Sequence, residues 1–194
     1  MSKRAAPEAR RAELIAATAR VLAARGAAGA SVRVIAAAAG VSPGLVTHHF
    51  GGVERLVEAT YDHVAARVGE ALEAAVAAAG ESPRARLAAY CDASFAPPIA
   101  DPTLLATWIA FWSLAQGSAA MQAGHARHYA GYRARLEVLL GETGVAADRR
   151  RLLAVGLTAL VDGLWLELCL SPGAFSAAEA RAVVAGYLAG VSGG

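Results

Sequence analysis

The sequence has 194 residues, of which 56% are hydrophobic, and a formal net charge of +2. This length suits one compact unit or two small domains, and a core of this size needs no disulfide bonds. The two cysteines, Cys91 and Cys169, fit no metal-binding or redox spacing. We therefore expect reduced core thiols in a cytoplasmic protein.

The chain is rich in Ala, Leu and Val and lacks the alternating pattern with β-branched residues that is typical of β-strands, so we predict an all-α fold. The charged first residues lack the apolar segment of a secretory signal. The most apolar stretch, residues 155–170, contains Asp162 and Glu167 and is shorter than the roughly 20 residues of a membrane span. We expect it to be buried against protein, with no membrane partner.

Basic groups collect at the N-terminal end of the chain. Residues 1–56 carry eight basic and three acidic side chains, while the remainder is slightly acidic. Such asymmetry is expected when only this end meets a polyanion, although a solvated tail would also produce it. We expect residues 1–9 to be loosely attached; Lys3 and Arg4 suit a solubilising tail, while Arg4, Arg10 and Arg11 could also reach phosphates or the minor groove.

The first helix is predicted over residues 9–24, with one apolar stripe formed by Leu14, Thr18, Val21 and Leu22. A shorter helix follows over residues 32–39. Ser31 is its expected N-cap, and Gly40 supplies a left-handed stop.

A second short helix is predicted over residues 43–50, after Ser42 as N-cap and Pro43 at the first helical position. Val46 and Phe50 face inward, while Gly44, Thr47 and His48 fall on the opposite face. Two short helices joined by a tight turn predict a helix-turn-helix, which places its second helix in the DNA major groove. A helical hairpin without DNA binding remains the alternative.

The order of residues around this motif resembles the TetR family of repressors. The resemblance rests on Gly26, Ser31, Arg33, Ile35, Ala36, Ala39, Gly40, Val41, Ser42, Gly44, His49, Phe50, Glu54 and Leu56. The segments VTHHF (residues 46–50) and ALVDGLW (residues 159–165) are similar to the choline-responsive, betaine-pathway subgroup. Thr47 and Val53 replace a frequent tyrosine and lysine that usually touch phosphates.

The resemblance implies a nine-helix TetR-type fold with a three-helix DNA-binding head and a helical effector-binding and dimerisation body. We place the head at residues 8–68, including the motif at 31–50 and the start of a linking helix, and the body at residues 69–194. Further helices are predicted over residues 53–79, 83–95, 101–116, 119–140, 148–170 and 176–191. The last opens with a capping box, Ser176 to Glu179.

The predicted function is that of a homodimeric, ligand-responsive repressor on a near-palindromic double-stranded DNA operator. The residues expected to contact DNA are Arg33, Ser42, Pro43, Gly44, Thr47, His48 and His49. We expect Arg33 and His49 on phosphates, and Thr47 with His48 near base edges.

Apolar residues of the last two long helices are expected to form the dimer. Gly156, Ala159 and Gly163 make a track of small residues on an apolar helix, and Leu166 and Leu170 follow them. We predict that these five residues contact a second copy, because one helix-turn-helix reads only half a site. Packing within one chain is the alternative.

Aromatic residues of the body are either core or the lining of a cavity for a small effector. The candidates are Trp108, Phe111, Trp112, His125, Tyr129, Tyr132, Asp162 and Trp165. A choline-like quaternary ammonium effector would suit aromatic rings and a carboxylate; this hypothesis rests on the subgroup resemblance.

We find no catalytic motif, so we predict no enzyme, no cofactor and no metal. Two other classes stay open: a helical small-molecule binding protein without DNA binding, and a metal-dependent helical enzyme using His125 and His128.

Overall fold

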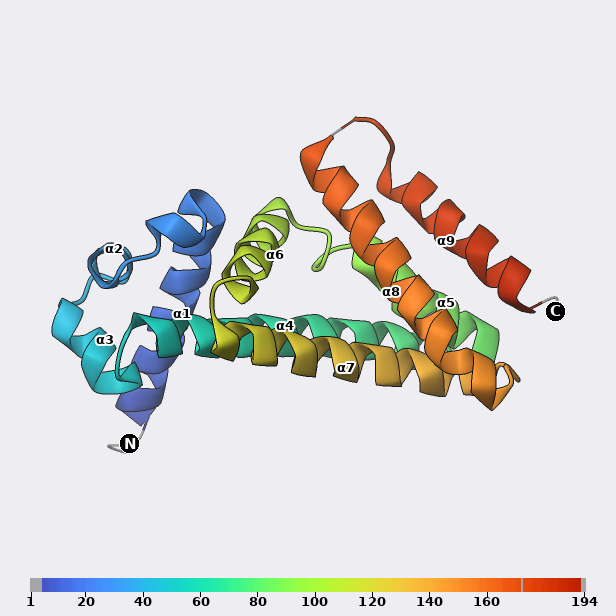
Figure 1. Cartoon of the computed structure of the whole chain (residues 1–194), viewed down its shortest axis with the longest axis horizontal. Coiled ribbons are helices and arrows are strands. Elements are labelled where there is room, and N and C mark those ends of the chain that lie inside the picture. The colour runs from blue at the N-terminus through green and yellow to red at the C-terminus, as the bar shows by residue number, and fades with distance from the viewer. Residues whose placement is uncertain (1–4, 172, 193–194) are drawn as a thin grey trace. The chain divides into compact units, whose positions relative to one another are not determined.

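The computed structural model describes residues 5–171 and 173–192, so the predictions for Lys3 and Arg4 lie outside the described residues. This part of the chain forms helices and no strand (Figure 1), which confirms the all-α class. Its nine α-helices are α1 (Ala5–Arg25), α2 (Val32–Ala38), α3 (Pro43–Phe50), α4 (Val53–Ala78), α5 (Pro83–Asp92), α6 (Pro102–Ala115), α7 (Ala119–Glu142), α8 (Ala147–Leu170) and α9 (Ala177–Ser192). Two short 3₁₀ helices, η1 (Ala27–Gly29) and η2 (Ala93–Phe95), lie between them.

The contacts divide the chain into two compact units. The first contains residues up to Ala66 together with Thr103–Ala126, and the second contains Arg67–Pro102 and the residues from Arg127 onward. The predicted boundary at residue 68 lies close to the division between the units after Ala66, which falls within the continuous helix α4. The segment Thr103–Ala126, predicted for the body, groups with the N-terminal unit. Helices α4 and α7 each contribute to both units.

The core of the first unit joins helices α1 to α4. It contains Leu14, Val21, Ile35, Ala36, Val46, Phe50 and Leu56, all buried. Thr18 and Thr60 are also fully buried, and each hydroxyl donates to the carbonyl one turn earlier, on Leu14 and Leu56 respectively. The predicted inner stripe of the first helix is therefore confirmed.

The first helix begins at Ala5, four residues before its predicted start. Pro7 lies in its first turn, where a proline is tolerated because that N–H has no helical partner. The fifth helix is shorter than predicted, since α5 ends at Asp92 and the chain tightens into η2. Such 3₁₀ turns are frequent where a helix ends.

In the second unit, α8 and α9 run side by side and both contact η2, while α9 also contacts α5. The predicted capping box opens α9. The Ser176 backbone N–H donates to the Glu179 carboxylate at 2.7 Å, and the Glu179 N–H donates to the Ser176 hydroxyl at 3.2 Å. The box satisfies two backbone donors and is confirmed.

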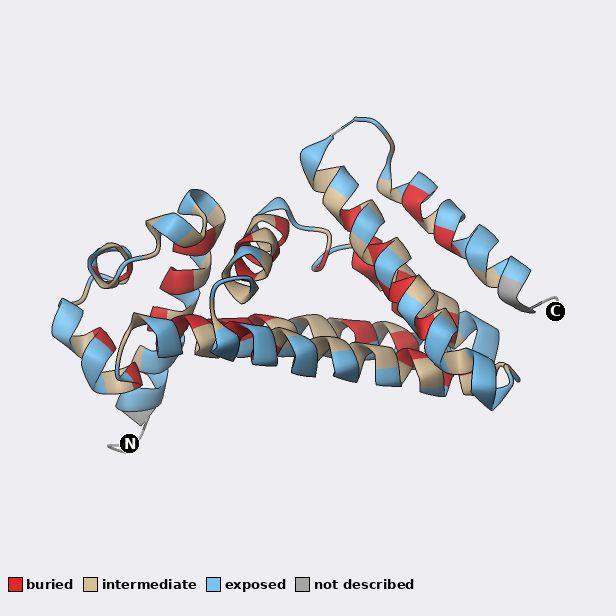
Figure 2. Ribbon diagram, in the orientation of Figure 1, coloured by how far each residue is buried: buried red, intermediate tan, exposed pale blue. Residues whose placement is uncertain are grey.

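One described helix, α8, is long and apolar enough to cross a membrane when judged by length and composition alone. In the single chain the stretch 155–170 is buried on one side only: Leu157, Val161 and Trp165 are buried, whereas Val155 and Leu170 are 42% and 65% exposed. Figure 2 shows the largely exposed surface of α9 beside it. The two cysteines are free thiols, Cys91 buried as expected and Cys169 only half-buried.

Candidate functional site

The helix-turn-helix is built by the local signals expected from the sequence. Ser31 caps α2, its hydroxyl accepting from the Val34 N–H at 3.3 Å. Gly40, with φ of 66°, closes α2 in a Schellman arrangement. In it, the Gly40 N–H donates to Ala37 O at 3.1 Å, and the Val41 N–H donates to Ala36 O at 2.9 Å. The chain then restarts at Pro43 as α3.

Helix α3 buries one face and exposes the other. Val46 and Phe50 lie in the core of the first unit. The remaining predicted contact residues of the turn and helix are exposed, namely Ser42, Pro43, Gly44, Thr47 and His48, whereas His49 is half-buried. A Cβ atom at Gly44 would meet nothing within 4 Å, so the backbone there is open to close approach.

The exposed face carries groups that suit a nucleic acid. Thr47 and His48 offer hydrogen-bond donors and acceptors at the positions opposite Val46, and Arg33 is exposed on α2. Residues 31–50 contain no acidic side chain. A polyanion can therefore approach this surface without like-charge repulsion from the motif itself.

Arg11 of α1 contacts the C-terminal end of α3. Its Nη1 donates to the backbone oxygen of His49, and its guanidinium carbon lies 4.1 Å from the centroid of the Phe50 ring. The His48 and His49 rings meet edge to face with centroids 5.1 Å apart. Sequence reasoning missed this contact, because 38 positions separate Arg11 from His49.

The predicted ligand-binding residues fall into two groups, one in each unit. Trp108, Phe111, Trp112 and His125 belong to the first unit. There the Phe111 ring stacks on Tyr61 at 4.4 Å, and Trp108 meets Tyr61 edge to face at 5.6 Å. The Tyr61 hydroxyl and His125 Nδ1 are 3.1 Å apart. These contacts make Phe111 and Trp108 part of a packed aromatic core.

Tyr129, Tyr132, Asp162 and Trp165 belong to the second unit, the first two on α7 and the last two on α8. The Tyr132 ring lies 5.3 Å from that of Tyr90. Tyr132 also interacts with Cys91, Asp162 and the Ser94 hydroxyl. We name the group Tyr90, Ser94, Tyr129, Tyr132 and Asp162 the polar cluster. Sequence reasoning did not select Tyr90 or Ser94.

Burial shapes the acid–base behaviour of the polar cluster. It raises the pKa of Asp162 from 3.8 to about 6, against the opposing effects of the Tyr129 hydrogen bond and the Arg133 charge. Burial likewise raises the pKa of Tyr132 well above its usual value, and the Ser94 hydroxyl opposes the shift. Asp162 is half-buried, and a carboxylate whose pKa is raised by desolvation would be stabilised by a cationic ligand.

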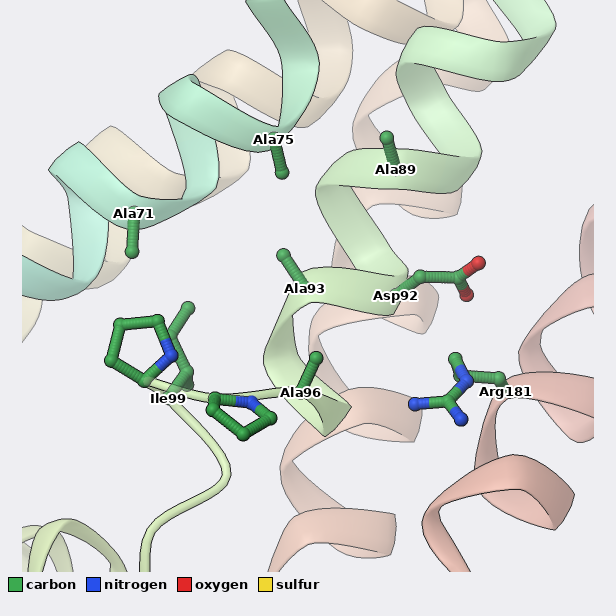
Figure 3. A pocket seen from close by; sticks show the side chains of 10 residues that line it. Ala71, Ala75, Ala89, Asp92, Ala93, Ala96, Ile99 and Arg181 are labelled. Carbon is green, nitrogen blue, oxygen red and sulfur yellow. The ribbon is translucent and has the colours of Figure 1, made fainter. Parts of the chain in front are cut away.

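A pocket of about 300 Å³ opens elsewhere among the residues of the second unit (Figure 3). Its walls are mainly small and apolar, and Asp92 and Arg181 are its two charged residues. The Arg181 guanidinium donates to Phe95 O at 2.9 Å, and burial raises the pKa of Asp92 while the Arg181 charge lowers it. None of the predicted ligand-binding residues lines this pocket.

The predicted dimer residues lie on α8 with different surroundings. Ala159, Gly163 and Leu170 are exposed, whereas Gly156 and Leu166 are half-buried. A Cβ atom at Gly156 would come within 2.5 Å of the Tyr187 hydroxyl of α9. Gly156 therefore serves a close approach of two helices within one chain.

Two families of known regulators match this chain. The bacterial regulatory proteins of the tetR family match residues 14–60, and the BetI-type transcriptional repressor C-terminal domain matches residues 83–193. The HTH-type transcriptional regulator BetI of Burkholderia thailandensis is 35% identical over 190 residues, which cover 97% of this chain and 96% of the relative. BetI of Ectopseudomonas mendocina is 36% identical over 188 residues, covering 92% and 91% respectively.

Solved structures agree with these matches. A transcriptional regulator of Pseudomonas aeruginosa PAO1 superposes with a TM-score of 0.88 at 40% identity, covering 97% of this chain and 92% of that one. A regulator from Saccharomonospora viridis, solved in complex with choline, has a TM-score of 0.78 at 19% identity, with 94% and 96% covered, and shows the fold alone. These relatives are regulators and not enzymes. The chain thus belongs to the TetR family of DNA-binding transcriptional regulators, with a C-terminal part of the BetI type.

Proposed function

We propose that the chain is a cytoplasmic, homodimeric repressor that binds a near-palindromic operator through α3 and is released by a small cationic effector. The observation that carries the proposal is the outward face of α3, which exposes Ser42, Pro43, Gly44, Thr47 and His48 while Val46 and Phe50 anchor the helix. In this arrangement Thr47 and His48 read base edges, and Arg33 and His49 contact phosphates.

The exposed apolar surface of α8 and α9 supports a dimer. Leu152, Val155 and Leu170 of α8 are 63%, 42% and 65% exposed, and Val183 and Tyr187 of α9 are 50% and 37% exposed. Monomeric proteins rarely leave such a series of large apolar side chains in water. A second copy covering it through the same helices gives a two-fold interface and supplies the second head that a palindrome requires.

The polar cluster, together with Trp165 three residues after Asp162 on α8, supports a cationic effector. Tyr129, Tyr132 and Trp165 supply aromatic rings, and Asp162 supplies a carboxylate that burial has deprived of solvation. A quaternary ammonium group is attracted by aromatic faces and requires no hydrogen-bond acceptor. The BetI names of the relatives and the choline found with the regulator of Saccharomonospora viridis favour choline as the first compound to test. Trp108, Phe111, Trp112 and His125 serve packing in this proposal.

The effector acts on DNA binding through α7 and α4. Tyr129 and Tyr132 lie on α7, and Arg135 of the same helix donates to both carboxylate oxygens of Glu73 on α4, at 2.7 and 2.9 Å. Helix α4 continues without a break into the first unit. A ligand that shifts α7 therefore moves α4, and it lowers DNA affinity only by as much as it prefers the non-binding arrangement.

Selection of duplexes from a random-sequence DNA pool by the purified protein tests the proposal and identifies the operator sequence at the same time. We expect enrichment of a near-palindrome with half-sites about one helical turn apart. Choline added to the complex should raise the dissociation constant of the wild-type protein and leave that of Asp162→Asn unchanged. A pool that shows no enrichment of any sequence would overturn the operator proposal. A calorimetric titration with choline that releases or absorbs no heat would exclude choline as the effector.

A further inference from the structure

Arg11 contacts α3 at its C-terminal end, where backbone carbonyl groups lack hydrogen-bond donors within the helix. The last carbonyl groups of a helix have no partner within it, and a cation there also meets the negative end of the helix dipole. The Gly51 N–H donates to Thr47 O at 2.8 Å. Arg11 supplies a charged donor to another carbonyl of this last turn, that of His49.

Arg11 also fixes the helix from its buried side. Its guanidinium lies over the Phe50 ring at 4.1 Å, and Phe50 is one of the two α3 residues in the core. One side chain of α1 thus holds both the backbone and the anchoring ring of the last turn of α3. The exposed residues Thr47 and His48 belong to the same turn.

We propose that Arg11 is a positioning residue, which orients the last turn of α3 for base recognition and does not itself contact a DNA phosphate. The inference rests on the proposed DNA-binding face of α3. The guanidinium is already engaged by the His49 carbonyl and the Phe50 ring, so its contribution to DNA binding passes through the side chains that it aligns.

The neighbouring Arg10 provides a matched control. It carries the same charge on the same helix, but it pairs with Glu13 one turn away and not with α3. Removing Arg10 therefore measures the effect of losing one positive charge at this end of α1. Any additional effect of removing Arg11 reports on the orientation of α3.

The experiment compares Arg11→Met, Arg11→Lys and Arg10→Met with the wild type. Each binds two probes, a duplex selected from the random pool by the wild-type protein and a scrambled duplex of equal composition, over a series of salt concentrations. For Arg11→Met we expect about a tenfold loss of affinity for the selected duplex, little loss for the scrambled one, and an unchanged salt slope. A direct phosphate contact would instead weaken both probes alike and reduce the slope by about one.

Arg11→Lys keeps the charge but not the planar fork, so we expect it to restore only part of the discrimination between the two duplexes. It also keeps the inference testable if Arg11→Met does not fold, because a phosphate contact predicts that lysine preserves both affinity and discrimination. Thermal melting separates orientation from stability, since a merely stabilising role would lower the melting temperature and leave discrimination by the folded protein intact.

The results distinguish a failure of the positioning role of Arg11 from a failure of the proposed DNA-binding face of α3. If Thr47→Ala alters base preference but Arg11→Met matches Arg10→Met on both duplexes, the positioning role of Arg11 is wrong while the α3 face stands. If neither Thr47→Ala nor Arg11→Met changes binding to the selected duplex, the assigned face is wrong and the inference about Arg11 is refuted with it.

Discussion

Replacing Asp162 by asparagine should stabilise the protein at neutral pH. Burial raises the pKa of this carboxyl from 3.8 to about 6, so the folded state binds its proton more tightly than the unfolded state does. The free energy of unfolding is therefore highest below about pH 4, where the carboxyl is protonated, and this contribution is lost as the pH rises through about 6. A pKa difference of about two between the folded and unfolded states lowers the free energy of unfolding by roughly 3 kcal/mol above pH 7.

The Asp162→Asn variant keeps an oxygen that can accept from the Tyr129 hydroxyl, but it carries no charge to desolvate. Urea unfolding followed by circular dichroism, at one protein concentration, measures the free energy of unfolding of both proteins. We expect the variant to exceed the wild type by up to about 3 kcal/mol at pH 7.5, and the difference to close at pH 4.

A variant that is no more stable than the wild type at pH 7.5 would refute this reasoning, because it would mean that the carboxylate is well solvated or paired. The same charge that destabilises the empty protein is the one proposed to hold the effector. Choline should therefore raise the melting temperature of the wild type and not that of Asp162→Asn, and its affinity for the wild type should fall as the pH drops below 6.

Three further predictions concern the DNA-binding face, the apolar surface and the last helix. Thr47→Ala should relax the base preference in a repeated selection from the random pool, whereas Arg33→Ala should weaken binding to all duplexes and lower the salt slope by about one; equal effects of both changes would contradict the assigned roles. Leu152→Glu places a charge on the proposed interface, so sedimentation should show monomers that retain helical circular dichroism, and a persistent dimer would exclude this surface. Ser176→Ala removes the N-cap of α9 and should cost about 1 kcal/mol of unfolding free energy, and a variant of unchanged stability would show that the cap contributes nothing.

Local signals carried most of the prediction of the fold. The Ser31 cap, the Gly40 stop, the Ser42–Pro43 restart and the capping box before α9 each act over a few residues and can be recognised without tertiary structure. Helix boundaries are predicted less accurately where no capping or helix-breaking residue marks them. The first helix extends to Ala5 through an alanine-rich segment whose proline is harmless in the first turn.

Long-range contacts were beyond the reach of sequence reasoning. The pairing of Arg11 with His49 depends on how α1 crosses α3, and the meeting of Tyr90 with Tyr132 depends on how α5 packs against α7. The predicted set of ligand-binding residues rests on residue type alone, so it combines the aromatic core around Tyr61 with the polar cluster of the other unit. Helical periodicity could not distinguish them, because both groups lie on inward-facing stripes.

Left-handed glycines bracket the recognition segment, Gly40 before it and Gly51 after it, with φ of 66° and 77°. Between them Val46 and Phe50 are buried in the core and Val41 packs against it. Substitutions at the exposed positions of this segment should therefore have little effect on folding, so these side chains can be replaced together. Retargeting to a new DNA sequence would then require transplanting few side chains, provided that the aromatic ring beneath Arg11 is kept.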